Sequence, residues 1–299
     1  MDKIAEKLSS GIPKEYIKLK HHIAPYTTFE IGGPADIFIT PSEVDQIIWA
    51  VTISKELQIP YYILGKGSNI LIDDKGLRGI VIYLGENFSK STVLDNKIKA
   101  QSGASLEEVS KLAMEKSLTG LEFAVGIPGS VGGGIFMNAG AYEGQLGDVV
   151  DEVTGILEHE VVTYTKDDLE FGYRSSTFQK EGVIILEATL RLEKGNKEKV
   201  KSYIEDLTTK RETKQPLELP SAGSVFKRPQ GYYAGKLIQD SGLKGFSIGG
   251  AQVSEKHCGF IVNKGNATSQ DVKNLVAHIQ KTVKEKFGVE LKRELKYLG

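Results

Sequence analysis

Residues 126–134 form a glycine-rich stretch, GIPGSVGGG, that few kinds of local structure can accommodate. Five of its nine residues are glycine, more than a tight turn requires. Glycine lacks a Cβ, so it adopts positive φ angles and lets other groups approach its backbone closely. Successive N–H groups in such a loop can converge on an anion, and if the residues after Pro128 open a helix, the positive end of its dipole adds to the effect. The stretch therefore predicts a loop that binds a phosphate-containing ligand.

A second loop, GKGSN at residues 65–69, lies between two apolar segments and is compatible with the same role or with an ordinary turn. Neither loop matches the G-x-G-x-x-G pattern of dinucleotide-binding folds or the P-loop pattern. The residues expected to contact the ligand are Gly65, Lys66, Gly67, Ser68, Asn69, Gly126, Ile127, Pro128, Gly129, Ser130, Gly132 and Gly133.

Composition narrows the class of protein. A length of 299 residues predicts two or three domains, and 38 basic against 39 acidic residues lack the basic excess of a general nucleic-acid binder. Cys258 is the only cysteine, which excludes an intramolecular disulfide, and the five histidines are scattered, so no metal site is expected. The N-terminus lacks the apolar core of a signal peptide, and no stretch reaches the ~20 apolar residues of a membrane span. We therefore expect a cytoplasmic protein that binds neither nucleic acid nor membrane.

Strand and helix patterns alternate irregularly and predict three units, at residues 1–85, 86–204 and 205–299. Strands are predicted at residues 35–40, 61–64, 70–72, 80–84, 97–100, 152–165, 183–193 and 291–298. Helices are predicted from a Ser42 cap to about Leu57, at 106–116 with a Ser105–Glu108 capping box, at 196–214, at 233–240, and at 271–287 with a Ser269 cap.

Several polar residues stand in unusual places. Arg174 lies between strand segments, where it can bind a carboxylate or form a structural ion pair. Ser224 follows small residues that leave room for a ligand, although a turn serine explains it equally well. Glu290 and Glu294 are four residues apart and would share one side of a strand, either as a site or as a solvated edge. His257 has no partner at metal-ligand spacing, so a structural role is expected.

Segments along nearly the whole chain carry a more specific pattern. They are TTFEIGGPAD (27–36), LGKGSNILI (64–72), GIPGSVGGGIFMNAGAY (126–142), YRSSTF (173–178), PSAGSVFKRP (220–229), GLKGFSIGGAQVSEKHCGFIVN (242–263) and LKRELKYLG (291–299). In this order, the set resembles the UDP-N-acetylenolpyruvoylglucosamine reductases of bacterial peptidoglycan synthesis.

The resemblance implies an α+β protein. It would have a vanillyl-alcohol-oxidase-type FAD-binding fold of two α/β subdomains, followed by a C-terminal α+β substrate domain. NADPH would reduce FAD, and the hydride would then pass to UDP-N-acetylglucosamine enolpyruvate, giving UDP-N-acetylmuramate. Such an enzyme serves cell-wall synthesis, and through it cell shape and division. We expect it to act as a monomer.

The resemblance also assigns roles to individual residues. Arg174 would stabilise the enolate-like charge, Ser224 would donate the proton, and Glu294 would orient or polarise the carboxylate side of the intermediate. Expected substrate contacts are Lys227, Tyr233, Lys236, Gln252 and His257.

Two departures from the family pattern bear on the site. One branch has a tyrosine-bearing loop after the arginine motif, but here Phe178 runs almost directly into residues 183–192, so Tyr232 or Tyr233 is the candidate to close the site. Arg293 stands before Glu294 where the family commonly has proline.

Two other functions remain compatible with these patterns. One is an oxidoreductase that uses the same FAD scaffold on another substrate, which the PSAGSVFKRP segment disfavours. The other is a catalytically silent UDP-sugar-binding protein, which the presence of Arg174, Ser224 and Glu294 disfavours.

Overall fold

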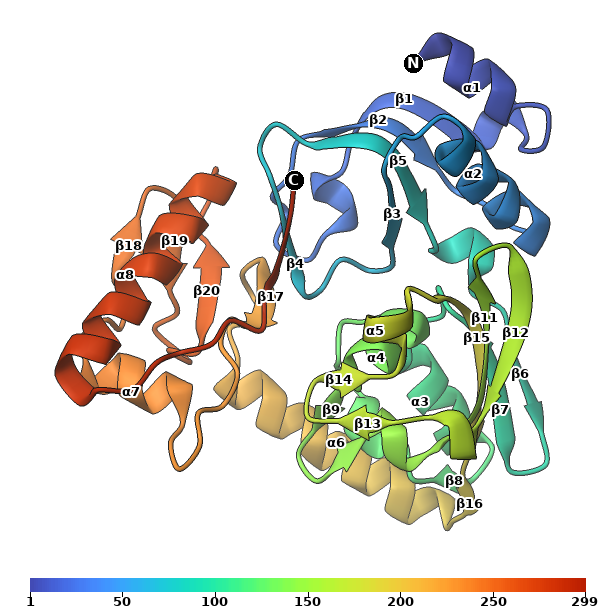
Figure 1. Cartoon of the computed structure of the whole chain (residues 1–299). Coiled ribbons are helices and arrows are strands. Elements are labelled where there is room, and N and C mark those ends of the chain that lie inside the picture. Colours follow the sequence, from blue (N-terminus) through green and yellow to red (C-terminus); the bar gives the residue numbers. More distant parts are fainter. The chain divides into compact units, whose positions relative to one another are not determined.

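The computed structural model describes residues 1–299 and divides into two compact units, each assembled from stretches that are distant in the sequence (Figure 1). Unit 1 comprises Met1–Leu19, Ile37–Lys66 and Gly79–Arg211, and unit 2 comprises Lys20–Asp36, Gly67–Arg78 and Glu212–Gly299. The division into three consecutive domains stays a prediction. No helix combines the length and the apolar character that crossing a membrane demands.

The largest sheet of unit 1 has five strands in the order β12-β11-β15-β7-β6, and each neighbouring pair is antiparallel. The strands are β6 Ser91–Leu94, β7 Lys97–Gln101, β11 Val150–Leu157, β12 Glu160–Thr165 and β15 Ile184–Arg191. Helices α3 (Leu106–Glu115) and α4 (Val131–Met137) pack against it (Figure 1). Their side chains form one buried core with those of the sheet, for example Val109 and Ile135 with Ala188.

A second sheet has the order β1-β2-β5-β3, with β3 parallel to β5. Its strands are β1 Ile17–His22, β2 Pro34–Ile39, β3 Tyr61–Leu64 and β5 Leu77–Tyr83. Helices α1 (Asp2–Leu8) and α2 (Val44–Glu56) accompany it, and a core that includes Ile39, Ile47 and Ile80 joins α2 to the strands.

Unit 2 contains a four-stranded antiparallel sheet in the order β17-β20-β19-β18. The strands are β17 Ser221–Ser224, β18 Ser247–Ile248, β19 Ala251–Val253 and β20 Phe260–Asn263. One face packs against α8 (Ser269–Phe287), whose predicted apolar stripe is buried as expected: Val272, Leu275, Val276, Ile279 and Val283. The same core takes in Phe29, Ile31 and Leu71 from earlier stretches of the chain.

The remaining elements are short, apart from α6. Strand β4 (Ile70–Ile72) pairs in parallel with β21 (Lys296–Leu298), and the other helices are α5 Phe178–Glu181, α6 Lys197–Lys214 and α7 Ala234–Asp240. Two-residue strands are β8 Leu118–Thr119, β9 Gly140–Ala141, β10 Gly144–Gln145, β13 Phe171–Gly172, β14 Ser175–Ser176 and β16 Glu193–Lys194. Single 3-10 turns lie at Lys14–Tyr16, Ala24–Tyr26, Glu86–Phe88, Glu122–Ala124, Leu146–Asp148 and Lys166–Asp168.

Two predicted helix caps are wrong. Helix α2 begins after Glu43 rather than Ser42, and the Ser42 N–H instead donates to the side chain of Gln46 at 2.9 Å. Ser105 does precede α3, but its hydroxyl makes no capping bond, so the predicted box with Glu108 does not form.

The cap of α8 lies one residue earlier than predicted. The Thr268 hydroxyl accepts from the Asp271 N–H, and the Asp271 carboxylate accepts from the Thr268 N–H, each at 3.0 Å. The predicted cap, Ser269, donates its hydroxyl to Asp74 at 2.8 Å. The hydroxyl of Ser269, the cap predicted from local sequence, is therefore engaged by Asp74, which is distant in the sequence.

Two predicted strands also differ from the structure. Residues 152–165 are not one strand but the hairpin β11–β12, which turns at Glu158, a residue with φ of 57°. The predicted strand at 291–298 is reduced to β21, so Glu290 and Glu294 do not share a strand face. The other predicted strands and helices are confirmed to within a few residues.

Candidate active site

The glycine-rich stretch leads into α4, so the condition considered for the residues after Pro128 is met. Ser130 is the N-cap, with extended backbone angles, and its hydroxyl accepts from the Gly133 N–H at 3.4 Å. The Gly132 N–H donates to the Ser102 carbonyl at 2.9 Å, which fixes the first turn against the segment preceding α3. The loop is thus continuous with the N-terminal end of a helix, where backbone N–H groups favour anions.

The glycines of this stretch differ in how much space surrounds them. A Cβ at Gly132 would overlap the Ser102 side chain, and one at Gly134 would meet Leu106 and Leu146. Gly133, in contrast, is exposed, and the only atom within 4 Å of a Cβ there would be the Ser130 hydroxyl, at 3.3 Å. Packing explains the first two glycines but not Gly133, whose exposed backbone is open to a ligand.

Gly65, the first residue of the 65–69 loop, lies beside the glycine-rich stretch within unit 1. A Cβ on Gly65 would overlap the hydroxyl of Ser130, the residue that caps α4. Gly67, which belongs to unit 2, has φ of 57° and packs against Tyr26 and Thr27 of the same unit. The Gly67 and Ser68 N–H groups donate to no acceptor in the protein, and unpaired donors of this kind are what an anion needs.

Arg211, which the sequence analysis did not single out, supports the first residue of the glycine-rich stretch. Its side chain is buried, with 6% of the residue exposed, and its Nη1 donates to the Gly126 carbonyl at 2.7 Å. Its Nε has no partner, and burial lowers the pKa of the guanidinium. The Arg211 Cζ atom lies 5.9 Å from the centre of the Tyr142 ring. Helical spacing could have indicated that Arg211 is buried, because it continues the buried stripe of α6 formed by Val200, Ile204 and Leu207.

Ser224 and Glu294 come together within unit 2 although 70 residues separate them. The Glu294 N–H donates to the carbonyl of Val225, the residue after Ser224, at 2.8 Å. The Lys227 N–H donates to the Lys292 carbonyl at the same distance, so the two segments run antiparallel. The Asn69 side-chain amide donates to the Glu294 carbonyl at 3.4 Å, which connects the end of the 65–69 loop to this pair.

The surroundings of Ser224 leave space for a ligand. Ser224 is exposed at the end of β17. The preceding residue, Gly223, has φ of 71°, and no atom lies within 4 Å of where its Cβ would be. The small residues before Ser224 therefore do what the sequence suggested and leave its hydroxyl accessible.

Arg174 belongs to unit 1 and occupies a tight turn. Gly172 pairs with Ser175, so Tyr173 and Arg174 form the two-residue turn of the β13–β14 hairpin. Arg174 has φ of 55°, a conformation more typical of glycine or asparagine. Its Nη2 donates to the Gly140 carbonyl at 3.0 Å, and its guanidinium lies 5.2 Å from the centre of the Tyr173 ring.

Three of the five expected substrate contacts lie in the 227–236 region. Lys227 follows β17 on the segment that pairs with Lys292. Tyr233 precedes α7, is 63% exposed, and lies under the Arg228 guanidinium at 4.0 Å. Lys236 forms an ion pair with Asp240 at 2.9 Å.

His257 has the structural environment that its sequence context suggested. Its Nδ1 accepts from the Gly259 N–H at 3.0 Å, and its ring meets Phe260 edge-on, with centroids 5.0 Å apart. Burial lowers the pKa of His257, which favours the neutral ring, and an Nδ1 that accepts a hydrogen bond leaves the ring proton on Nε2 in that form. No three His, Cys, Asp or Glu side chains are grouped in a way that could hold a metal ion.

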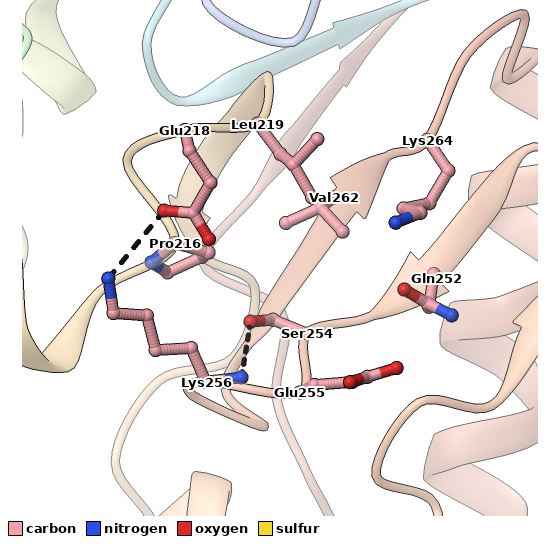
Figure 2. Close-up of a pocket in the computed structure, with 9 residues that line it drawn as sticks. All are labelled: Pro216, Glu218, Leu219, Gln252, Ser254, Glu255, Lys256, Val262 and Lys264. Atoms are coloured by element: carbon pink, nitrogen blue, oxygen red, sulfur yellow. Dashed lines mark hydrogen bonds and ion pairs between the residues drawn. The ribbon is translucent and has the colours of Figure 1, made fainter.

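Gln252, the fifth expected contact, lines a small pocket together with Leu219 and Val262 (Figure 2). The pocket has a volume of about 170 Å³, and two of its lining residues, Glu218 and Lys256, form an ion pair 3.6 Å long. Ligand pockets typically measure roughly 300–1,000 Å³. This pocket is therefore too small to enclose a nucleotide sugar, and of the predicted site residues it contains only Gln252.

Two regions of the chain match models of known protein families. Residues 35–163 match the family model of an FAD binding domain, and residues 215–298 match the C-terminal domain of UDP-N-acetylenolpyruvoylglucosamine reductase. The reductase of that name from Clostridium perfringens (strain SM101 / Type A) is 53% identical over 287 residues, covering 96% of this chain and 94% of the relative. That from Alkaliphilus oremlandii is 50% identical and covers 100% of this chain and 99% of the relative.

Solved structures agree with the sequence relatives. The crystal structure of UDP-N-acetylenolpyruvylglucosamine reductase from Thermus caldophilus superposes with a TM-score of 0.81 at 33% identity, covering 95% of this chain and 98% of that chain. The glucose dehydrogenase Phl p 4 shares the fold alone, with a TM-score of 0.50 at 15% identity over 65% of this chain and 44% of that chain. The predicted α+β fold of the vanillyl-alcohol-oxidase type is confirmed. The chain belongs to the UDP-N-acetylenolpyruvoylglucosamine reductase family.

Proposed function

We propose that the protein reduces UDP-N-acetylglucosamine enolpyruvate to UDP-N-acetylmuramate, a step of peptidoglycan synthesis, with FAD as its cofactor and NADPH as its reductant. The observation that carries the proposal is the near full-length similarity to reductases of this name, which extends over the FAD-binding and C-terminal regions alike. We further propose that the enzyme acts as a monomer in the cytoplasm. Light scattering of the purified protein gives its molar mass in solution and tests whether it is a monomer.

The two glycine-containing loops are suited to hold the pyrophosphate of FAD. Gly133 offers exposed backbone at the start of α4, and Gly65 lies against Ser130 beside it. The residues assigned to this task are those of 65–69 and 126–130 with Gly132 and Gly133. When bound, FAD supplies the hydride chemistry that no protein side chain provides.

Ser224 is assigned as the proton donor. Hydride addition to the enolpyruvyl methylene carbon leaves negative charge on the neighbouring carbon, which must then be protonated. The exposed Ser224 hydroxyl, next to the open space at Gly223, is accessible for that transfer. A serine hydroxyl is a weak acid, so the transfer relies on the basicity of the enolate-like intermediate and on groups around the hydroxyl.

Arg174 and Glu294 are assigned to the charge that develops beside the carboxylate. A guanidinium binds a carboxylate through two parallel hydrogen bonds and stabilises an enolate-like oxygen electrostatically. The bond from the Glu294 N–H to the Val225 carbonyl holds Glu294 next to the Ser224 strand, which supports its assignment to orient the carboxylate side of the intermediate.

Ser224→Ala tests the proton-donor role. FAD reduction by NADPH should stay near the wild-type rate, while the second half-reaction, reduction of the enolpyruvyl sugar, should slow by roughly 10²–10⁴-fold. Stopped-flow absorbance of the flavin measures the two steps separately. Ser221→Ala, at the other end of β17, is the matched control and should leave both rates unchanged. Equal impairment of both half-reactions by Ser224→Ala would exclude the assignment.

The two competing functions are separated by simpler measurements. A silent UDP-sugar-binding protein would oxidise no NADPH, and one without cofactor would show no flavin absorption. An oxidoreductase with another substrate would bind FAD but would oxidise no NADPH in response to UDP-N-acetylglucosamine enolpyruvate. Substrate-dependent NADPH oxidation by a yellow protein supports the proposal over both.

A further inference from the structure

Asn138, at the end of α4, is a fully buried polar residue that the proposed mechanism does not use. None of its surface is exposed, and it caps the helix in the left-handed conformation, with φ of 44°. Its side-chain amide donates to the Gly172 carbonyl at 2.9 Å and to the Gln145 side chain at 3.0 Å. Its side-chain oxygen accepts from the Gly147 N–H at 2.9 Å. The whole amide is therefore engaged in tertiary hydrogen bonds.

One of these bonds fixes the hairpin that carries Arg174. Gly172 is the residue before the Tyr173–Arg174 turn, so the Asn138 amide holds the strand that enters the turn. The Arg174 guanidinium itself donates to Gly140, two residues after Asn138.

The strand that leaves the turn is tied to α4 as well. The Ser176 hydroxyl donates to the Phe136 carbonyl at 2.8 Å. The Gln179 side-chain amide donates to the same carbonyl at 2.7 Å and to the Arg174 carbonyl at 3.2 Å. Both strands of the hairpin are thus bonded to the last turn of one helix.

The opposite end of that helix is the glycine-rich stretch. Ser130 caps α4 at its start and Asn138 at its end, with seven residues between them, or about 10 Å at 1.5 Å per residue. A rigid element of this length sets the distance between whatever its two ends hold. We propose that Asn138 is a positioning residue, which holds Arg174 in a fixed place relative to the cofactor-binding loop. This inference rests on the proposed role of Arg174.

A purely local capping role does not explain the choice of asparagine. Glycine takes the left-handed cap conformation without strain and is the commonest residue there. A buried amide, in contrast, is costly unless all of its groups are bonded. The distinguishing contribution of Asn138 is therefore its side-chain bonds to residues 145, 147 and 172, rather than its backbone conformation.

Asn138→Gly separates these two contributions, because it keeps the backbone conformation and removes the amide. Asn138→Asp keeps the acceptor for Gly147 but turns the donor into a carboxylate oxygen that faces two acceptors. In both variants, FAD content and FAD reduction by NADPH should stay near wild type. The second half-reaction should slow by about 10–100-fold, as expected when a charged group is displaced by about 1 Å. Gln179→Ala should likewise slow only the second half-reaction. Because Gln179 is less buried than Asn138, this variant serves as the test if the Asn138 variants fold poorly.

A control variant and a double mutant distinguish positioning of Arg174 from a general loss of stability. Asn96→Ala removes a similar amide bond, to the Leu192 carbonyl at 2.7 Å, and should lower stability without favouring either half-reaction. In an Arg174→Met background, Asn138→Gly should have little further effect, because it acts through Arg174. Full multiplicative effects, or equal slowing of both half-reactions, would overturn the inference. If Arg174→Met slows the second half-reaction and Asn138→Gly does not, the inference alone fails. If Arg174→Met slows neither, the proposed role of Arg174 fails first.

Discussion

At the scale of single residues, the candidate catalytic arginine occupies a backbone conformation that its residue type seldom takes. Arg174 has φ of 55° at the second position of its turn, where glycine or asparagine would be free of strain. Such a conformation costs roughly 1–3 kcal/mol and persists only where the surroundings enforce it. The bonds from Gln179 to the Arg174 carbonyl and from Arg174 to Gly140 provide that enforcement. The strain therefore agrees with a functional demand on this side chain.

Neighbouring glycines of α4 should respond oppositely to the same substitution. Gly133→Ala adds a methyl group to exposed backbone and should leave the stability of the apoprotein unchanged or raise it by about 0.5–1 kcal/mol, because alanine favours a helix. It should nevertheless lower FAD retention. Gly132→Ala drives a methyl group into Ser102 and should cost about 1–3 kcal/mol. Thermal unfolding and the ratio of flavin to protein absorbance measure the two effects. Wild-type FAD affinity in Gly133→Ala would remove this glycine from the cofactor site.

The caps predicted for α2 and α8 are misplaced, and the reason is physical. Ser42 and Ser269 are good capping residues, yet Glu43 and Thr268 take the extended backbone that a cap needs. The Ser269 hydroxyl is also occupied by Asp74, 195 residues away. Local sequence shows which residues are able to cap a helix, whereas tertiary partners decide which one does.

At the scale of elements, helix α6 packs beside the glycine-rich stretch and also donates a hydrogen bond to it through Arg211. Val200, Ile204 and Leu207 pack with Val125, the residue before the glycine-rich stretch. Arg211 extends the stripe by one turn and reaches the Gly126 carbonyl. The helix thus holds the start of the loop through both apolar contact and a charge-assisted hydrogen bond.

Arg211→Met should separate stability from cofactor binding. Methionine removes a buried charge whose Nε is unpaired, which offsets the loss of one hydrogen bond, so the free energy of unfolding should change by no more than about 1 kcal/mol. The loop loses its anchor at Gly126, and the dissociation constant of FAD should rise about tenfold. Fluorescence titration of the apoprotein measures it. Lys210→Ala, which removes the exposed partner of Asp206, should leave FAD affinity unchanged. An unaltered dissociation constant in Arg211→Met would exclude the anchoring role.

The two errors in predicted strands have different causes, an unrecognised turn at residues 158–159 and irregular pairing at residues 291–295. Residues 152–165 are rich in Val, Ile and Thr on both sides of Glu158 and His159, and neither of these two is a typical hairpin residue, so no turn was predicted there. At the C-terminus, residues 291–295 are held by single bonds to the 225–227 segment rather than by a continuous ladder. Periodicity alone could not distinguish these arrangements from regular strands.

At the scale of the whole molecule, the order of the motifs predicted the fold and the family, while the assembly of unit 2 was beyond sequence reasoning. Its core joins Phe29 and Leu71 to α8, and its candidate catalytic pair, Ser224 and Glu294, is brought together by backbone pairing across 70 residues. Resemblance named these two residues, but only the structure describes their adjacency. The predicted substrate contacts at Lys227, Tyr233, Lys236, Gln252 and His257 stay predictions.

The ion pair between Asp73 and Lys273 joins two of the stretches that build unit 2. The Lys273 ammonium donates to one Asp73 oxygen at 2.7 Å, and the Lys75 N–H donates to the other at 3.0 Å. The hydrogen bond from Lys273, followed by that from Lys75, holds the pKa of Asp73 below its ordinary value. A carboxyl group with a lowered folded-state pKa stabilises the fold above its unfolded pKa of about 3.9, and that stabilisation is lost as the pH falls through the folded value.

Asp73→Asn should therefore destabilise the protein in a pH-dependent way. The amide keeps the size of the side chain but removes the charge, so the variant should lose about 0.5–1 kcal/mol at pH 7, as for a partly exposed ion pair. The difference from wild type should shrink as the pH falls below about 4, because the wild-type carboxyl group is then protonated too. Urea unfolding of the FAD-loaded protein at both pH values measures it. Glu285→Gln, in the exposed pair with Lys281 on the same helix, is the control and should change little at either pH. A difference of the same size at both pH values would mean that Asp73 acts through packing rather than charge, and that the link between residues 67–78 and α8 is not electrostatic.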